Sequence, residues 1–162
     1  MSFPEPRAAW RPDDGARAET VSTNPGSVTR FVAPGSVSGA EFGLFETRIP
    51  AGGPGAVPHY HGGFSEAFYV LSGRLAVLTD RQWRTAGAGD FVYVPARVVH
   101  AFHAEDDEEA RFLILFVPGA PRERYFRGLA EFAARSVAPS RGEVDAFARE
   151  CDQVNLRDWD GR

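Results

Sequence analysis

The sequence contains no lysine, since all 18 of its basic residues are arginine. Lysine forms Schiff bases in covalent catalysis and supplies the phosphate-binding side chain of the P-loop, so both chemistries are excluded. The single cysteine, Cys151, excludes an internal disulfide and a zinc site built from several cysteines. We expect this thiol to be unreactive and partly packed in the last helix of the chain.

Long apolar runs are also missing. No stretch approaches the roughly 18 apolar residues that a membrane helix requires, and residues 1–7 lack the basic and then apolar pattern of a signal peptide. We therefore expect a cytoplasmic protein without a membrane partner. The formal charge of −4 argues against nucleic acid as a partner, because affinity for phosphate backbones comes from clustered positive charge.

What the sequence does contain is a β-rich centre. At 162 residues, with 43% hydrophobic side chains, the chain suits one domain with a sizeable core. Residues 1–27 are rich in proline and glycine and show little periodicity, which predicts an N-terminal arm. Short apolar stretches separated by turn signals follow over residues 28–120, and they predict an antiparallel all-β sandwich or barrel. The expected strands are Val28–Ala33, Phe42–Ile49, Val57–His61, Glu66–Leu71, Leu75–Leu78, Gln82–Arg84, Phe91–Val94, Val98–Ala104 and Arg111–Val117.

The pattern changes to helical spacing over Arg122–Ser136. Ser140 and Glu143 then have the Ser-x-x-Glu form of a capping box, which predicts a second helix over Val144–Val154. We therefore predict that residues 121–162 are a helical extension, which either covers one mouth of the barrel or packs on its outside. We expect the arginines of the first helix to lie on an ordinary exposed face. They are Arg122, Arg124 and Arg127.

Candidate metal ligands gather in two segments. His59 and His61 project from one face of an extended strand, because side chains alternate with a period of two. A Gly-Gly turn follows and brings the next strand back beside the first, which places Glu66 near the two histidines. His100 lies in a later strand candidate, Val98–Ala104, and shares a face with Phe102, whereas His103 lies on the opposite face.

The predicted site therefore consists of His59, His61, Glu66 and His100. Nitrogen and carboxylate donors of this kind suit a divalent transition metal, namely Fe, Ni, Mn, Co, Cu or Zn, rather than Ca or Mg. We interpret His103 as a surface or packing residue. Glu66 has two predicted roles, as a ligand and as the catalytic base that accepts a hydroxyl proton when it leaves the ion.

These residues resemble the two motifs of the cupin superfamily. The first motif is matched by Gly53, His59, His61, Glu66 and Gly73, and most of the second is matched by Gly89, Pro95, His100 and the residues between them. Two positions depart from the family pattern. Arg97 stands where glycine is usual and Ala104 where asparagine is frequent. Arg97 suggests either that its turn does not require a left-handed conformation, or that its guanidinium points toward a substrate or an acid.

The resemblance implies a single-domain cupin, a jelly-roll barrel of the double-stranded β-helix type, with the metal ligands inside. Within the family, the chain is similar to the quercetinase-like cupins in the segments around Glu66 and Phe91 and in its helical tail. That similarity implies a metal-dependent dioxygenase whose partners are dioxygen and a flavonol or another enolisable aromatic. Two alternatives stay open, namely non-oxidative cyclase, isomerase or lyase chemistry with the metal as Lewis acid, and small-molecule binding without catalysis.

Apolar side chains on the inward faces are expected to form the core, and some of them to line a substrate pocket. The candidates are Phe68, Phe102, Phe112, Ile114 and Phe116. A homodimer is compatible with the open edges of a barrel, through an edge strand or the N-terminal arm.

Overall fold

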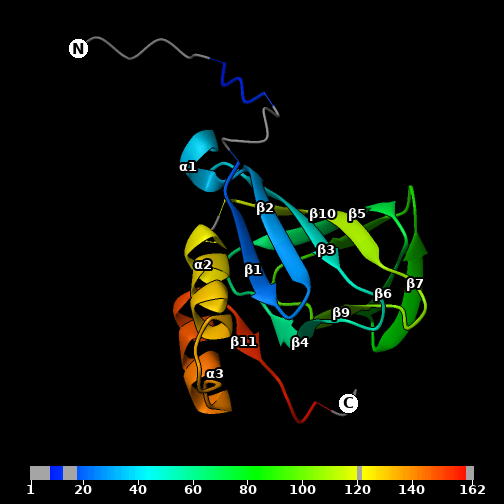
Figure 1. Cartoon of the computed structure of the whole chain (residues 1–162). Helices are drawn as coiled ribbons and strands as arrows, with labels where there is room; N and C mark the ends of the chain where they lie inside the picture. The colour runs from blue at the N-terminus through cyan, green and yellow to red at the C-terminus, as the bar shows by residue number, and fades with distance from the viewer. Residues whose placement is uncertain (1–7, 13–17, 120–121, 160–162) are drawn as a thin grey trace.

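A computed structural model describes residues 8–12, 18–119 and 122–159 of the protein. Two antiparallel sheets enclose its core (Figure 1). The larger sheet contains, in spatial order, β1 (Thr20–Asn24), β2 (Ser27–Ala33), β3 (Gly43–Ile49), β10 (Ala110–Val117), β5 (Ser65–Ser72) and β8 (Phe91–Val94). The smaller sheet contains β11 (Val154–Asn155), β4 (Pro54–Tyr60), β9 (His100–Ala104), β6 (Arg74–Thr79) and β7 (Gln82–Gly87). The predicted all-β jelly-roll fold is confirmed.

Strand β10 lies at the centre of the larger sheet and shows why the chain folds in this way. Its side chains alternate between the core and the outside, so that Phe112, Ile114 and Phe116 are buried as predicted. Ile114 pairs with Phe45 on one neighbouring strand and with Phe68 on the other. An antiparallel strand with one apolar face is stable only when that face is covered, and the second sheet and the helices cover it.

The larger sheet begins before the predicted boundary at residue 28. β1 lies within the segment expected to be an arm and pairs with β2 through partners such as Thr20 and Arg30. Gly26, at φ +77°, allows the tight reversal between these two strands. The arm prediction is therefore wrong for residues 20–27, and most of its remainder falls on residues 1–7 and 13–17, outside the described residues.

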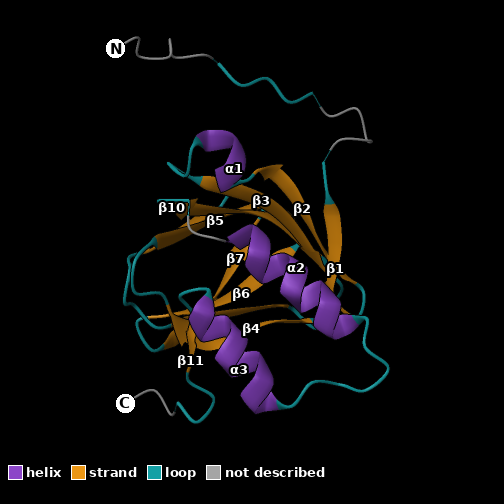
Figure 2. Ribbon diagram, turned by 90° about the vertical axis from the view of Figure 1, so that its left-hand side faces the viewer, coloured by secondary structure: helices purple, strands orange, loops and turns teal. Residues whose placement is uncertain are grey.

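Two C-terminal helices lie on the same side of the barrel (Figure 2). α2 (Arg122–Ala133) directs Phe126 onto Phe45 and Phe31 of the barrel core, with ring centroids 4.9 Å and 6.3 Å apart. α3 (Arg141–Glu150) begins at the predicted capping box. It ends at Glu150 rather than at Val154, because Val154–Asn155 pairs with β4 as strand β11. A third, single-turn helix, α1 (Gly35–Ser38), was not predicted. Among the described residues, no helix combines the length and apolar character needed to cross a membrane.

Replacing Gly73 with alanine is expected to destabilise the barrel strongly. Gly73 has φ +74°, and a Cβ atom there would lie 1.7 Å from the main-chain oxygen of Glu109. Left-handed backbone costs about 1–2 kcal/mol for a residue with a Cβ atom. The steric conflict adds about 1–3 kcal/mol, as overpacking does elsewhere. Urea unfolding measures the free energy of unfolding of the variant.

Gly89→Ala is the matched control for this prediction. Gly89 also has a positive φ, of +91°, but nothing lies within 4 Å of the position of its Cβ atom. This variant should therefore lose only the conformational contribution. Equal losses in the two variants would contradict the steric explanation for Gly73.

Candidate metal centre

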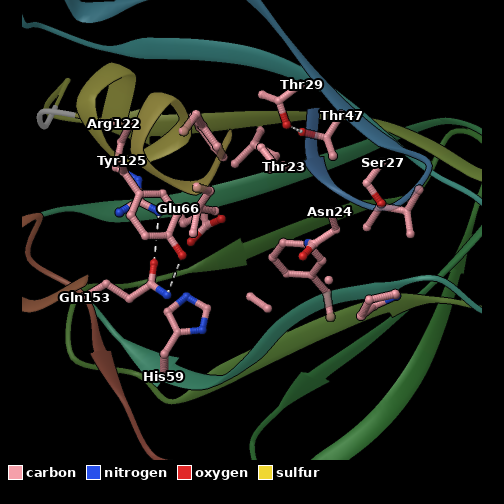
Figure 3. A pocket seen from close by; sticks show the side chains of 18 of the residues that line it. Thr23, Asn24, Ser27, Thr29, Thr47, His59, Glu66, Arg122, Tyr125 and Gln153 are labelled. Atoms are coloured by element: carbon pink, nitrogen blue, oxygen red, sulfur yellow. Dashed lines mark hydrogen bonds between the residues drawn. The ribbon is translucent and has the colours of Figure 1, made fainter. Parts of the chain in front are cut away.

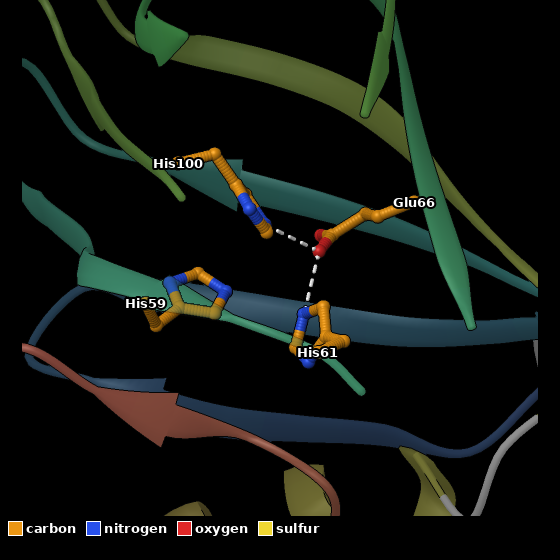
Figure 4. A group of neighbouring side chains, drawn as sticks. All are labelled: His59, His61, Glu66 and His100. Carbon is orange, nitrogen blue, oxygen red and sulfur yellow. Dashed lines mark hydrogen bonds and ion pairs between the residues drawn. The ribbon is translucent and has the colours of Figure 1, made fainter. Parts of the chain in front are cut away.

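The structure brings all four predicted ligands together. His59, His61, Glu66 and His100 are buried, and their ligand atoms lie within 4.8 Å of one another (Figure 4). Glu66 projects from β5 in the larger sheet, whereas His59 and His100 belong to β4 and β9 of the smaller sheet and pair directly across it. The group therefore joins the two sheets inside the barrel. His103 lies outside it and packs against Trp83, as the sequence predicted for a packing residue.

Backbone carbonyls orient all three histidine rings. The Nδ1 atoms of His59 and His100 lie 2.7 Å and 3.0 Å from the main-chain oxygens of Val57 and Val98, each two residues earlier in the chain. Nδ1 of His61 lies 2.8 Å from the main-chain oxygen of Asp152. A carbonyl only accepts hydrogen bonds, so each Nδ1 carries the proton. In the neutral ring the Nε2 atom then has a free lone pair, as a metal ligand requires.

The carboxylate of Glu66 lies between two of these rings. Its Oε2 atom is 2.9 Å from Nε2 of His61 and 2.9 Å from Nε2 of His100. Burial by itself would raise the pKa of Glu66, but the contacts with His100 and His61 outweigh it and hold that pKa well below its ordinary value. Glu66 is therefore ionised at neutral pH.

Burial favours the neutral form of two histidines. It lowers the pKa of His59 well below the ordinary value, and the neighbouring His100 and His61 lower it further. Burial also lowers the pKa of His61, although Glu66 opposes this effect. These residues therefore prefer the protonation states that bind a metal.

The donor set fits a divalent cation. A neutral ring with its proton on Nδ1 has only a lone pair at Nε2, and a lone pair cannot donate a hydrogen bond to the carboxylate of Glu66. A cation between the four ligand atoms satisfies Glu66 and the three rings together, without a buried imidazolium. Three imidazoles and a carboxylate suit transition metals, and the set does not identify which one.

The chain segment after α3 supports the metal ligands. The sequence did not predict this support. Besides its main-chain contact with His61, Asp152 accepts hydrogen bonds at its carboxylate from the N–H groups of Gly62 (3.0 Å) and Gly63 (2.7 Å). β11 pairs Asn155 with His59 on the next strand. Residues about 90 positions away in the sequence therefore hold the segment that carries His61, Gly62 and Gly63 in place. No local sequence pattern predicts such a contact.

A narrow cavity of about 60 Å³ adjoins the cluster, and His59 and Glu66 form part of its wall (Figure 3). Of the predicted pocket residues, Phe102, Ile114 and Phe116 line this cavity. Phe68 and Phe112 do not line it, and they pack against each other in the core with ring centroids 6.2 Å apart. The cavity wall also carries polar side chains, which are Thr23 and Asn24 of β1, Ser27 and Thr29 of β2, Thr47 of β3, Arg122 and Tyr125 of α2, and Gln153.

Two arginines differ from the predictions. Arg122 is only 3% exposed and lines the cavity, so the prediction of an exposed helix face is wrong for this residue. Arg97 has φ +71° and donates its N–H to the main-chain oxygen of His61 at 2.7 Å. The backbone at Arg97 is therefore left-handed, and this hydrogen bond stabilises it. The interpretation that this turn does not require a left-handed conformation is wrong. The Arg97 side chain is exposed and does not line the cavity.

Comparison with known proteins identifies the family. The family model of the cupin domain matches residues 45–116. Polyketide synthase CurC from Streptomyces cyaneus is 32% identical over 76% of this chain and 69% of its own length. The chain belongs to the cupin family. This cupin is also 30% identical, over 80% of its length, to quercetin 2,3-dioxygenase from Bacillus subtilis (strain 168), although it spans only 37% of that relative.

Two solved structures share the fold. KdgF from Halomonas sp. has a TM-score of 0.60 at 17% identity, covering 72% of this chain and 99% of the other. The polyketide cyclase RemF from Streptomyces resistomycificus has a TM-score of 0.58 at 19% identity, covering 70% of this chain and 82% of the other. At such identities the likeness describes the barrel alone.

Proposed function

We propose that this cupin is a metal-dependent dioxygenase that acts on a flavonol-like or other enolisable aromatic molecule. The observation that carries the proposal is the buried group of three histidines and one glutamate, of which His59 and Glu66 line a cavity together with apolar and polar side chains. The resemblance to quercetin 2,3-dioxygenase supports the oxidative form of the chemistry. Both atoms of dioxygen enter the product in such a reaction, so that no separate reductant is needed.

His59, His61, Glu66 and His100 would hold the metal. When bound there, a redox-capable divalent metal supplies positive charge for the oxyanion of the substrate and a route for electrons to dioxygen. Glu66 accepts the hydroxyl proton of the substrate on a carboxylate oxygen. Because its contacts with His100 and His61 hold its pKa low, Glu66 acts as a base only after it moves away from them.

The cavity walls orient the substrate and exclude water. Phe102, Ile114 and Phe116 offer apolar contacts to an aromatic ring, for which the cavity of about 60 Å³ has to widen on binding. Phe126 of α2 lines the cavity on the side of the helices. Exclusion of water strengthens the electrostatic interactions of the reacting groups and protects an activated substrate from side reactions.

A second candidate function is non-oxidative cyclisation, isomerisation or elimination on a β-dicarbonyl molecule. It is favoured by the relative named as a polyketide synthase, because that relative is covered over a larger share of its length than the Bacillus dioxygenase is. The same ligands would then hold the metal as a Lewis acid, and Glu66 would move the proton without any consumption of dioxygen.

Oxygen consumption decides between these functions. We expect the purified protein to contain about one equivalent of a transition metal by elemental analysis. We also expect it to consume dioxygen in an oxygen electrode with a panel of flavonols and other enolisable aromatics. The same sample after treatment with a chelator is the control. Turnover under strict anaerobiosis would select the non-oxidative function, and a metal-loaded protein that is inert in both assays would contradict both enzymatic functions.

A further inference from the structure

Arg122, the first residue of α2, has an unusual environment for a charged side chain. It is 3% exposed, and aromatic rings surround its guanidinium. The Cζ atom lies 3.8 Å from the ring centre of Tyr125, 4.8 Å from that of Phe116 and 5.5 Å from that of Phe64. Such stacking favours a guanidinium over other cations, because the group is planar and weakly hydrated.

The polar partners of Arg122 are neutral. Its terminal nitrogens donate to Oε1 of Gln153 at 3.0 Å and to the main-chain oxygen of Cys151 at 3.4 Å. The Nε atom is buried without a partner. Within the described part of the chain, no carboxylate forms an ion pair with Arg122. By contrast, the neighbouring Arg124 and Arg127 of the same helix pair with glutamates at the surface.

A buried charge without a counter-ion is costly and is normally paired. Glu66 is the buried carboxylate that interacts with Arg122 through space, but its Oε2 atom is directed at His61 and His100. A bound metal would engage that carboxylate further. The cavity would then have two positive centres, the bound metal and Arg122, and Glu66 as its buried carboxylate.

The opposite end of the cavity is polar and neutral. Thr29 and Thr47 share a hydrogen bond of 3.1 Å between their hydroxyl oxygens, and the hydroxyl of Ser27 is buried without a partner (Figure 3). The cavity is also lined by apolar side chains, among them Phe102, Ile114 and Phe116. The cavity therefore matches a molecule with some apolar surface, a hydrogen-bonding group at one end and a negative charge at the other.

We propose that Arg122 is an oxyanion receptor, so that the substrate carries a carboxylate or a similar acidic oxygen group beside the atom that binds at the metal. This inference rests on the proposed function for the location of the substrate and adds its charge class. The free Nε–H and the remaining N–H groups offer the donors for an oxyanion, and the side chain that carries them is buried.

Salicylate and salicylamide test the proposal, because they have the same shape and differ in charge. Isothermal titration of the metal-loaded protein should show a preference for salicylate. In Arg122→Gln the affinity for salicylate should fall at least about tenfold, as expected for loss of a hydrogen bond to a charged group. The affinity for salicylamide should change less than about threefold. Arg124→Gln, which removes a surface charge from the same helix, should leave both affinities unchanged.

Arg122→Lys is a second variant, in case Arg122→Gln does not fold. Because it keeps the positive charge, it should retain a reduced preference for salicylate. Equal losses for both probes in Arg122→Gln would overturn the proposal, since they would indicate a purely structural role. So would a wild-type protein that binds neither probe or shows no preference. Elemental analysis of the same samples separates the two proposals, because absence of metal contradicts the proposed function, whereas an unchanged metal content with no preference for salicylate contradicts only the oxyanion receptor.

Discussion

His100→Ala is expected to lower the affinity of the protein for Co²⁺ by more than about 100-fold, because loss of even a supporting partner of a metal ligand costs about 10–100-fold. His100 is fully buried, and its Nε2 atom faces Glu66 at 2.9 Å. Alanine removes one of the four ligand atoms and leaves the carboxylate with one partner fewer. Titration with Co²⁺, followed by its visible absorption and by competition with a chelator, measures the affinity.

The matched control is His103→Ala. His103 belongs to the same strand, β9, but it lies on the other face and packs against Trp83. Its removal should leave the affinity for Co²⁺ within about twofold of the wild type, because it contributes no ligand and orients none. A similar loss of affinity in both variants would show that the strand, rather than the ligand, is responsible.

Metal removal should also lower thermal stability. A ligand present at about 1,000 times its Kd adds about 4 kcal/mol to the free energy of unfolding, which corresponds to at least about 8 °C in Tm for a chain of this size. The chelator should therefore lower the Tm of the wild type and of His103→Ala, and it should have little effect on His100→Ala. Equal effects of the chelator on all three proteins would contradict metal binding at this cluster.

The ligand cluster could be predicted because its signals are local. The alternation of side chains places His59 and His61 on one face, and a Gly-Gly turn returns the chain to Glu66. The prediction of His100 as a ligand depended on the second motif, which is also a short contiguous pattern. The alternating face of Phe112, Ile114 and Phe116 was readable for the same reason, since period-two hydrophobicity depends only on neighbouring residues.

Contacts between distant segments could not be predicted. Arg122 has the spacing of an exposed helical residue, and its burial depends on where α2 meets the barrel. β1 was missed because proline and glycine beside it indicate a turn as readily as an arm, and β11 because a strand of two residues has no periodicity. The division between Phe116, which lines the cavity, and Phe112, which packs behind it, depends on the curvature of the closed barrel rather than on parity.

The contact between Asp152 and the ligand loop leads to the second large effect. Asp152→Ala removes the carboxylate that accepts hydrogen bonds from Gly62 and Gly63 and so loosens the main-chain oxygen that orients His61. We expect the affinity for Co²⁺ to fall by about 10–100-fold, the usual consequence of losing support for a ligand. Loss of the hydrogen bonds should lower the free energy of unfolding by about 1–3 kcal/mol.

Asp90→Ala separates metal support from stability. The Asp90 carboxylate also accepts a hydrogen bond from a glycine N–H, that of Gly87 at 2.8 Å, but in a turn that contains no ligand. Its removal should cost similar stability and leave the affinity for Co²⁺ unchanged. Asp152→Asn keeps one acceptor oxygen and tolerates the φ of +56° at this position, so its affinity should lie between those of Asp152→Ala and the wild type. If Asp152→Ala lost stability but bound Co²⁺ like the wild type, the C-terminal segment would brace the barrel without orienting His61.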